Sequence, residues 1–326
     1  MKFVRSKWKY MVYVIIGVVL MVLTLVTGTY GLPKEDKEIY YEALKLDEKV
    51  KGFGFPDFAI SDYKVRFFDG DADYVIKGET IEKEKAVFET FVGTTVEVDG
   101  EFQVMLPTYG RFAQMYSALS SVENMAEGSI SFDEADYSQK AHIATLWHEA
   151  FHTWQFTKSA EELYELAEKA SIGGENSYEE VVQNEVDSNH DQVLLLEKEI
   201  QLLFQAYQSE DMTAKRLLLE QVFELQEERA SLLSEQAVVA EQYYKTVEGS
   251  ARYIESCVYK ELEGEEAWEN IYMSPFVYEN GSGKYYTEGM IKCMILDQIV
   301  PDWKKNFDVT VSLDVLLHQG LEEMQK

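Results

Sequence analysis

The chain has 326 residues, of which 59 are acidic and 30 basic, so its formal net charge is −29. An apolar fraction of 46% argues against a disordered chain, and only two cysteines exclude a disulfide-rich scaffold and a four-cysteine zinc site. The acidic excess argues against nucleic acid as a partner, because phosphates would be repelled over most of the surface.

Residues 1–33 predict a transmembrane signal-anchor with a short basic tip. They hold four basic residues and no acid, so residues 34–326 carry 26 basic and 59 acidic groups, a net charge of −33. The 24 residues from Tyr10 to Pro33 are uncharged, and a helix over this run reaches bilayer thickness. The positive-inside rule then predicts a single-pass protein of the cell membrane with an extracytoplasmic carboxy-terminal domain. A cleaved signal peptide is the alternative.

Residues 34–51 are highly charged and predict a helical stalk. Residues 52–137 have a different texture, in which glycine and proline separate short runs rich in β-branched and aromatic residues. This pattern predicts a small sheet, with a hairpin at Asp99-Gly100 between two of the runs.

From residue 138 onward the pattern is helical. Apolar residues recur at three-to-four spacing between Ala141 and Lys169, and the 74 residues from Glu175 to Glu248 contain neither glycine nor proline. A break near 209–213 predicts a long antiparallel helical pair. Further helices are expected over 241–262, 285–299 and 312–325, with an irregular segment over 264–283. The fold class is therefore mainly α within α+β, and residues 52–326 form one domain with a β-containing part (52–137) and a helical part (138–326).

The first of these helices contains His148-Glu149-Ala150-Phe151-His152. Histidines four residues apart leave the same helix face, where both imidazoles can bind one Zn²⁺. Glu149 lies on the adjacent face, where its carboxylate can take a proton from water that zinc has acidified. The surrounding tryptophan, leucine and phenylalanine side chains indicate a buried helix, in which histidines need partners.

A zinc site needs a third protein ligand, and two glutamates are candidates. Glu248 opens the run 248–255 (EGSARYIE), whose small residues allow a close approach to the first helix. Arg252 and Glu255, one and two turns further on, can pair with each other and support the metal ligands. Glu185 is the alternative, since it lies nearer to His152 in the sequence.

With HEAFH, an acid-rich helical insertion and EGSARYIE, the chain resembles gluzincin-type zinc metallopeptidases, including exported and membrane-anchored bacterial proteins. The resemblance covers roughly residues 90–305 and includes the segment 286–303. It implies a zincin-like helical metallopeptidase domain with the helical pair as an insertion. It also implies one zinc ion held by His148, His152 and Glu248, with Glu149 as the catalytic base.

These observations predict a membrane-anchored, extracytoplasmic zinc metallopeptidase that acts on a peptide or protein substrate. Hydrolysis of a non-peptide bond and a non-catalytic metal-binding surface protein with acidic interaction helices are the alternatives. Several side chains are candidate donors to the oxyanion, with Tyr286 favoured: Tyr253, Tyr285, Tyr286, His190 and His318. Cys257 and Cys293 form either a disulfide or two buried thiols.

Overall fold

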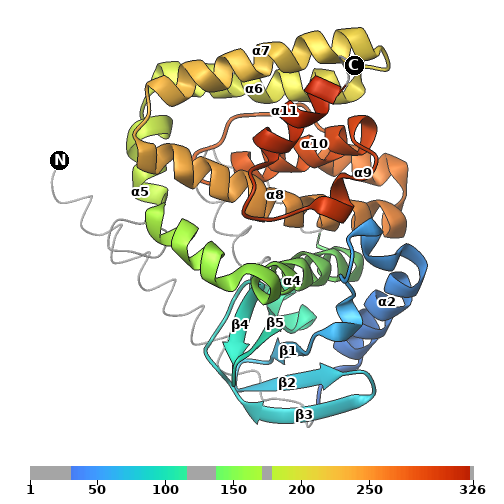
Figure 1. Ribbon diagram of the computed structural model, residues 1–326. Helices are drawn as coiled ribbons and strands as arrows, with labels where there is room; N and C mark the ends of the chain where they lie inside the picture. Colours follow the sequence, from blue (N-terminus) through green and yellow to red (C-terminus); the bar gives the residue numbers. More distant parts are fainter. Residues whose placement is uncertain (1–30, 116–136, 171–177, 324–326) are drawn as a thin grey trace, which may run out of the picture.

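The computed structural model describes residues 31–115, 137–170 and 178–323 (Figure 1). The predicted signal-anchor lies outside these ranges except for its last three residues. Within the described ranges no helix has both the length and the apolar character needed to cross a bilayer.

Residues 34–51, expected as a stalk, begin with helix α2 (Lys34–Val50). Ile39, Tyr40 and Ala43 are buried, and the helix packs against the long helix α4 (Gln139–Lys169). Although most of its residues are charged, their apolar neighbours form one stripe at helical spacing. This segment is therefore part of the folded core and not a free stalk.

Five strands form the small mixed sheet: β1 (Val65–Phe68), β2 (Ala72–Lys77), β3 (Thr80–Lys85), β4 (Thr94–Val98) and β5 (Glu101–Pro107). Their order is β3-β2-β1-β5-β4, so β4 is an edge strand. Only β1 and β5 are parallel. The predicted hairpin is confirmed, because Val98 pairs with Glu101 and leaves Asp99 and Gly100 as a two-residue turn. Both turn residues have positive φ, 53° and 78°, as a type I′ turn requires.

The predicted helical pair is confirmed as α6 (His190–Gln208) and α7 (Met212–Ser231). They follow α5 (Tyr178–Val182) and a π turn at Gln183–Asp187. Helix α8 (Glu235–Glu263) starts six residues earlier than predicted, because Ser234 caps it by accepting from the backbone N–H of Ala237. The last helices are α10 (Gly283–Ile299) and α11 (Leu313–Glu323), with a 3₁₀ turn at Trp303–Asn306 between them. The segment 264–283 is less irregular than expected, since it contains α9 (Glu265–Tyr272).

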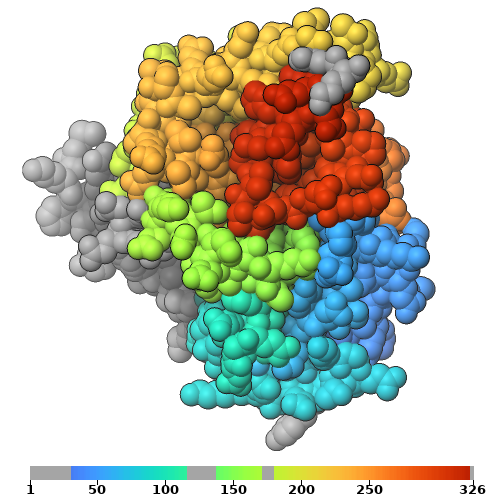
Figure 2. Space-filling model, in the orientation of Figure 1, coloured from blue at the N-terminus to red at the C-terminus, as the bar shows by residue number. Residues whose placement is uncertain are grey.

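Helix α4 lies between the sheet on one side and helices α6 to α11 on the other, with α2 beside the sheet (Figure 1). It packs against β4 and β5 on one side and α8 on the other. Figure 2 shows the same division, with the cyan sheet region below the green of α4 and the yellow to red helices above it. A mainly helical α+β fold with one small sheet is thus confirmed. Because α4 is enclosed by both layers, almost all of its residues from 142 to 155 are buried.

Helix α8 also packs closely against α10, at a crossing of two glycines. A Cβ atom added to Gly249 would lie 2.5 Å from the Cα of Gly289. A Cβ on Gly289 would lie only 1.9 Å from the carbonyl oxygen of Lys245. The small residue after Glu248 therefore serves the contact with α10, and not the expected approach to α4. Ser250 is the small residue that faces α4, where its hydroxyl contacts Gln155.

Candidate metal centre

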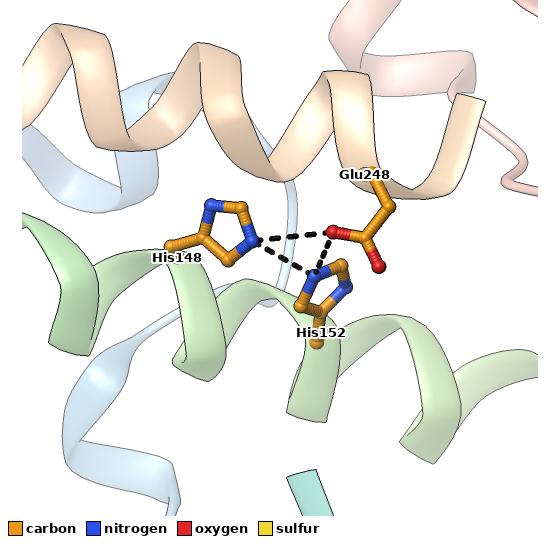
Figure 3. Close-up of side chains that lie close together, drawn as sticks. All are labelled: His148, His152 and Glu248. Atoms are coloured by element: carbon orange, nitrogen blue, oxygen red, sulfur yellow. Dashed lines mark hydrogen bonds and ion pairs between the residues drawn. The ribbon is translucent and has the colours of Figure 1, made fainter. Parts of the chain in front are cut away.

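The candidate metal centre lies between α4 and α8 (Figure 3). His148 and His152 project from successive turns of α4, and Glu248 projects toward them from α8. Both histidines are buried, at 8% and 7% exposure, and their rings meet edge to face with centroids 4.7 Å apart. The structure therefore brings together two side chains from one helix and a third from 96 residues further along the chain.

Three ligand atoms form a small triangle. The Nε2 atoms of His148 and His152 are 3.0 Å apart, and Oε2 of Glu248 lies 3.4 Å from the first and 3.1 Å from the second. Ligands at tetrahedral angles and bond lengths of about 2.0–2.1 Å are separated by about 3.3 Å. The triangle thus matches one face of a tetrahedral zinc site. Among the described residues, no other three His, Cys, Asp or Glu side chains meet in this way.

The hydrogen bonds behind the histidines leave their Nε2 lone pairs free for a metal. Gln155 donates its amide N–H groups to the carbonyl oxygen of Val247 and to Ser250, so its oxygen faces Nδ1 of His152 at 2.8 Å and accepts from it. Nδ1 of His148 donates to Oε2 of Glu255 at 3.0 Å. With both Nδ1 atoms protonated, each neutral imidazole has its lone pair on Nε2, the tautomer that metal binding requires.

The pairing predicted for Arg252 and Glu255 is present, and it reaches His148. Oε1 of Glu255 accepts from Arg252 and from the hydroxyl of Tyr272, while Oε2 accepts from His148. Burial disfavours the charge on Glu255, but Arg252 and His148 outweigh it and lower the pKa of the carboxyl to about 2. This carboxylate is therefore ionised throughout the physiological range and holds the His148 ring in place.

The electrostatics of the triad favour a cation. Burial alone would lower the pKa of His148, but hydrogen bonds to Glu248 and Glu255 outweigh it and raise that pKa to about 10. The pKa of His152 is also raised, because the attraction of Glu248 exceeds the effect of burial. The two histidines in turn hold the pKa of the buried Glu248 carboxyl far below its usual range. Positive charge placed between these three groups is strongly stabilised, whether it comes as protons or as a metal ion.

Glu149, on the turn of α4 between the two histidines, lies close to Gly93, the residue before β4. Its carboxylate touches the backbone of Gly93, where an added Cβ would lie 2.5 Å from Oε1. Burial raises the pKa of Glu149, and the two histidines oppose that effect. Thr95 of β4 donates to the carbonyl oxygen of Glu149 at 3.2 Å and contacts the Thr153 hydroxyl at 2.9 Å. The edge strand is thereby fixed against the turn of α4 that carries the Glu149 carboxylate.

Glu185, the alternative third ligand, lies elsewhere. Its carboxylate accepts from the backbone N–H and the hydroxyl of Ser234, at 2.8 and 2.7 Å. It thus supports the start of α8, the helix that carries Glu248 to the site. The Glu185 carboxylate therefore supports the amino-terminal cap of α8. Glu248 is the glutamate that lies beside His148 and His152.

Among the predicted oxyanion donors, only Tyr286 interacts with the triad. Burial and then the Glu248 carboxylate raise its pKa above its ordinary value. Tyr243, which the sequence analysis missed, responds to the same two causes, and its pKa is also raised. In the sequence, Tyr243 could have been found only from its position five residues before Glu248. The other candidates are engaged elsewhere or exposed: Tyr253 with Asp297, Tyr285 with Glu241, His318 stacked on Phe223, and His190 at the exposed start of α6.

Cys257 and Cys293 are free thiols and form no disulfide; Cys293 is buried, as expected for the second alternative, and Cys257 is half-buried. Burial raises the pKa of Cys257 to about 11, and the pKa of Cys293 is raised by the same cause. Both thiols are therefore protonated and weakly nucleophilic at neutral pH.

Comparisons of the chain with models of protein families, with curated proteins and with solved structures found no match.

Proposed function

We propose that the protein is a zinc-dependent metallopeptidase, anchored in the membrane by residues 1–33 and acting outside the cytoplasm. The observation that carries this proposal is the triangle of His148 Nε2, His152 Nε2 and Glu248 Oε2, with both tautomers set by protein hydrogen bonds. Three protein ligands and a free fourth position are typical of catalytic zinc sites, whereas structural sites have four protein ligands.

Zinc bound by these three residues would supply a Lewis acid and lower the pKa of water in the fourth position toward neutrality. Glu149, on the turn that separates the two histidines, would accept the proton of the attacking water and pass it to the leaving amine. Its pKa, raised by burial, brings it closer to the operating pH of a general base. The hydroxyls of Tyr286 and Tyr243, both beside Glu248, are the available donors to the oxygen of the scissile carbonyl.

The sheet edge supports a peptide as substrate. Among the described residues no strand pairs with the outer edge of β4, so its N–H and C=O groups can bind an extended chain by β-augmentation. Gly93 immediately precedes this strand and touches Glu149. A peptide added to β4 would therefore pass the end of the strand that is nearest to the candidate base.

Metal analysis of the full-length protein in detergent, with matched glutamate variants, tests the proposal. We expect one zinc per chain in the wild type and in Glu185→Ala, and loss of zinc in Glu248→Ala. Glu149→Gln should keep the zinc and lose peptide hydrolysis by about 100-fold or more. A wild-type protein without zinc, or a Glu149→Gln variant as active as wild type, would contradict the proposal. Zinc without any hydrolysis would favour the non-catalytic alternative.

A further inference from the structure

A cavity of about 350 Å³ opens beside the part of α8 that follows Glu248. Its walls come from α6, α8, α9, the segment 273–282 and the start of α10. Its apolar wall side chains include Phe204, Ile271, Phe276, Val277 and Met290. Two cations, Arg252 and Lys284, and one acid, Glu279, also line it. The cavity therefore combines apolar and polar walls, and both of its cations already pair with an acid outside the wall, Arg252 with Glu255 and Lys284 with Asp187.

Arg252 is the cation that remains open to a ligand. Lys284 is 3% exposed and already binds Asp187 at 2.8 Å and the carbonyl oxygen of Gly281. Arg252 uses Nη1 to bind Glu255, and its guanidinium covers the ring of Tyr272 at 4.6 Å. Its side chain is 33% exposed, and Nε and Nη2 have no acceptor within the part of the chain that the structure describes. A half-buried guanidinium with two nitrogens available favours a carboxylate.

The cavity is close to the candidate metal centre. Arg252 follows Glu248 by one turn of α8, a rise of about 6 Å along the helix. Glu255 links the two sites, because one of its oxygens accepts from Arg252 and the other from His148. Tyr286 interacts electrostatically with both Glu248 and Arg252, and its neighbour Thr287 lines the cavity. An extended peptide covers about 3.3 Å per residue, so about two residues match the rise of α8 between Glu248 and Arg252.

We propose that this cavity is a substrate-recognition subsite that binds a carboxylate next to a bulky apolar group, with Arg252 as the specificity-determining residue. The inference rests on the proposed peptidase function. A peptide offers a carboxylate from two sources, its carboxy-terminus and an aspartate or glutamate side chain. Because the protein as a whole repels anions, recognition of either source depends on short-range contacts with the guanidinium.

Peptide binding to the metal-free, full-length protein in detergent tests the subsite without relying on hydrolysis. Calorimetry would compare acetyl-Ala-Ala-Ala-Phe with a free carboxyl group, the same peptide as an amide, and amidated acetyl-Ala-Ala-Glu-Phe. We expect one of the two carboxylate peptides to bind about tenfold more tightly than the neutral amide, as a charge-assisted pair supplies. The tighter one identifies the source of the carboxylate. Equal affinities, or no binding at about 1 mM peptide, would overturn the subsite.

Two variants locate the ligand. Arg252→Gln should abolish the preference for the carboxylate peptide. Because Arg252 also supports Glu255, a second variant avoids the candidate metal centre. Val277→Asp, at a wall residue that is 72% exposed, should weaken binding of the carboxylate peptide about threefold or more beyond any change for the amide, because its charge repels a carboxylate. Leu232→Asp, at a position 59% exposed and outside the cavity wall, is the matched control and should change neither. Unchanged carboxylate binding in Val277→Asp would refute the placement of the ligand. Absence of peptide hydrolysis in the zinc-loaded wild type, with the carboxylate preference intact, would count against the peptidase proposal alone.

Discussion

Gln155 offers the sharpest test of how the metal centre is held, because its side chain bridges α4 and α8 without being a ligand. It is fully buried, accepts from His152 and donates to Val247 and Ser250. We consider Gln155→Leu, which keeps most of the volume and removes all three hydrogen bonds.

The expected loss follows from which groups lose a partner. The carbonyl oxygen of Val247 keeps its place within helix α8, and Ser250 keeps its hydrogen bond to Thr246 at 2.6 Å. Only the Nδ1–H of His152 becomes a buried donor without an acceptor, which costs about 1–3 kcal/mol. The buried leucine offsets part of this, so the metal-free protein should lose about 1–2 kcal/mol of unfolding free energy. Zinc affinity should fall about 10–100-fold, since the ring can rotate and the tautomer is no longer fixed.

Chelator competition measures the zinc dissociation constant, and urea denaturation of the metal-free protein measures stability. Ser250→Ala is the matched control, because it removes one acceptor of the same amide and leaves the bond between Gln155 and His152 intact. It should cost about 1 kcal/mol of stability and leave zinc affinity unchanged. Equal zinc affinity in Gln155→Leu and wild type, or an equal loss in both variants, would refute a positioning role for Gln155.

Three further predictions follow from the packing and the charges. Burial raises the pKa of Asp36 from 3.8 to about 7, although the hydrogen bond from the backbone N–H of Tyr109 opposes this shift. Between these two pH values the folded state keeps a proton that the unfolded state releases. The unfolding free energy therefore falls as pH rises from about 4 to 7. Urea denaturation at pH 5 and 8 should show a weaker pH dependence of the unfolding free energy in Asp36→Asn than in wild type. At pH 8 the variant should be more stable than wild type by up to about 4 kcal/mol. An unchanged pH dependence would contradict the prediction. Gly289→Ala should lose about 3 kcal/mol through overlap with the Lys245 carbonyl, whereas Gly283→Ala, with nothing within 4 Å, should be neutral in the same assay. Excess zinc should raise the melting temperature of wild type and not that of Glu248→Ala, and equal shifts in both would show binding elsewhere.

The part of the site that depends on one helix could be predicted from the sequence. Spacing alone places His148 and His152 on one face of α4, and the same reasoning pairs Arg252 with Glu255. Glu248 was harder, because its place depends on how α8 crosses α4. Since Glu185 lies on an equally acidic stretch, only the tertiary structure shows that it supports Ser234 instead.

Other features could not be predicted because they depend on contacts between segments that are distant in the sequence. The charges of residues 34–51 suggested a stalk, although Ile39 and Ala43 form a buried stripe whose partner, α4, is about 100 residues away. The role of Gln155 depends on a backbone carbonyl of α8, and a backbone group has no sequence signal. The short helix α9 was missed because glycines and a proline nearby suggested an irregular chain.

The bonds from Gln155 to α8 and from Glu255 to His148 join the two helices through atoms that a metal would not use. The ligand triangle is consequently maintained by the protein alone, across the 96 residues that separate His152 from Glu248. An ion could therefore leave and return without separating the two layers of the fold, and little chain ordering would accompany its binding. Metal exchange in such a centre is expected to be limited by access and ligand dissociation, and not by refolding.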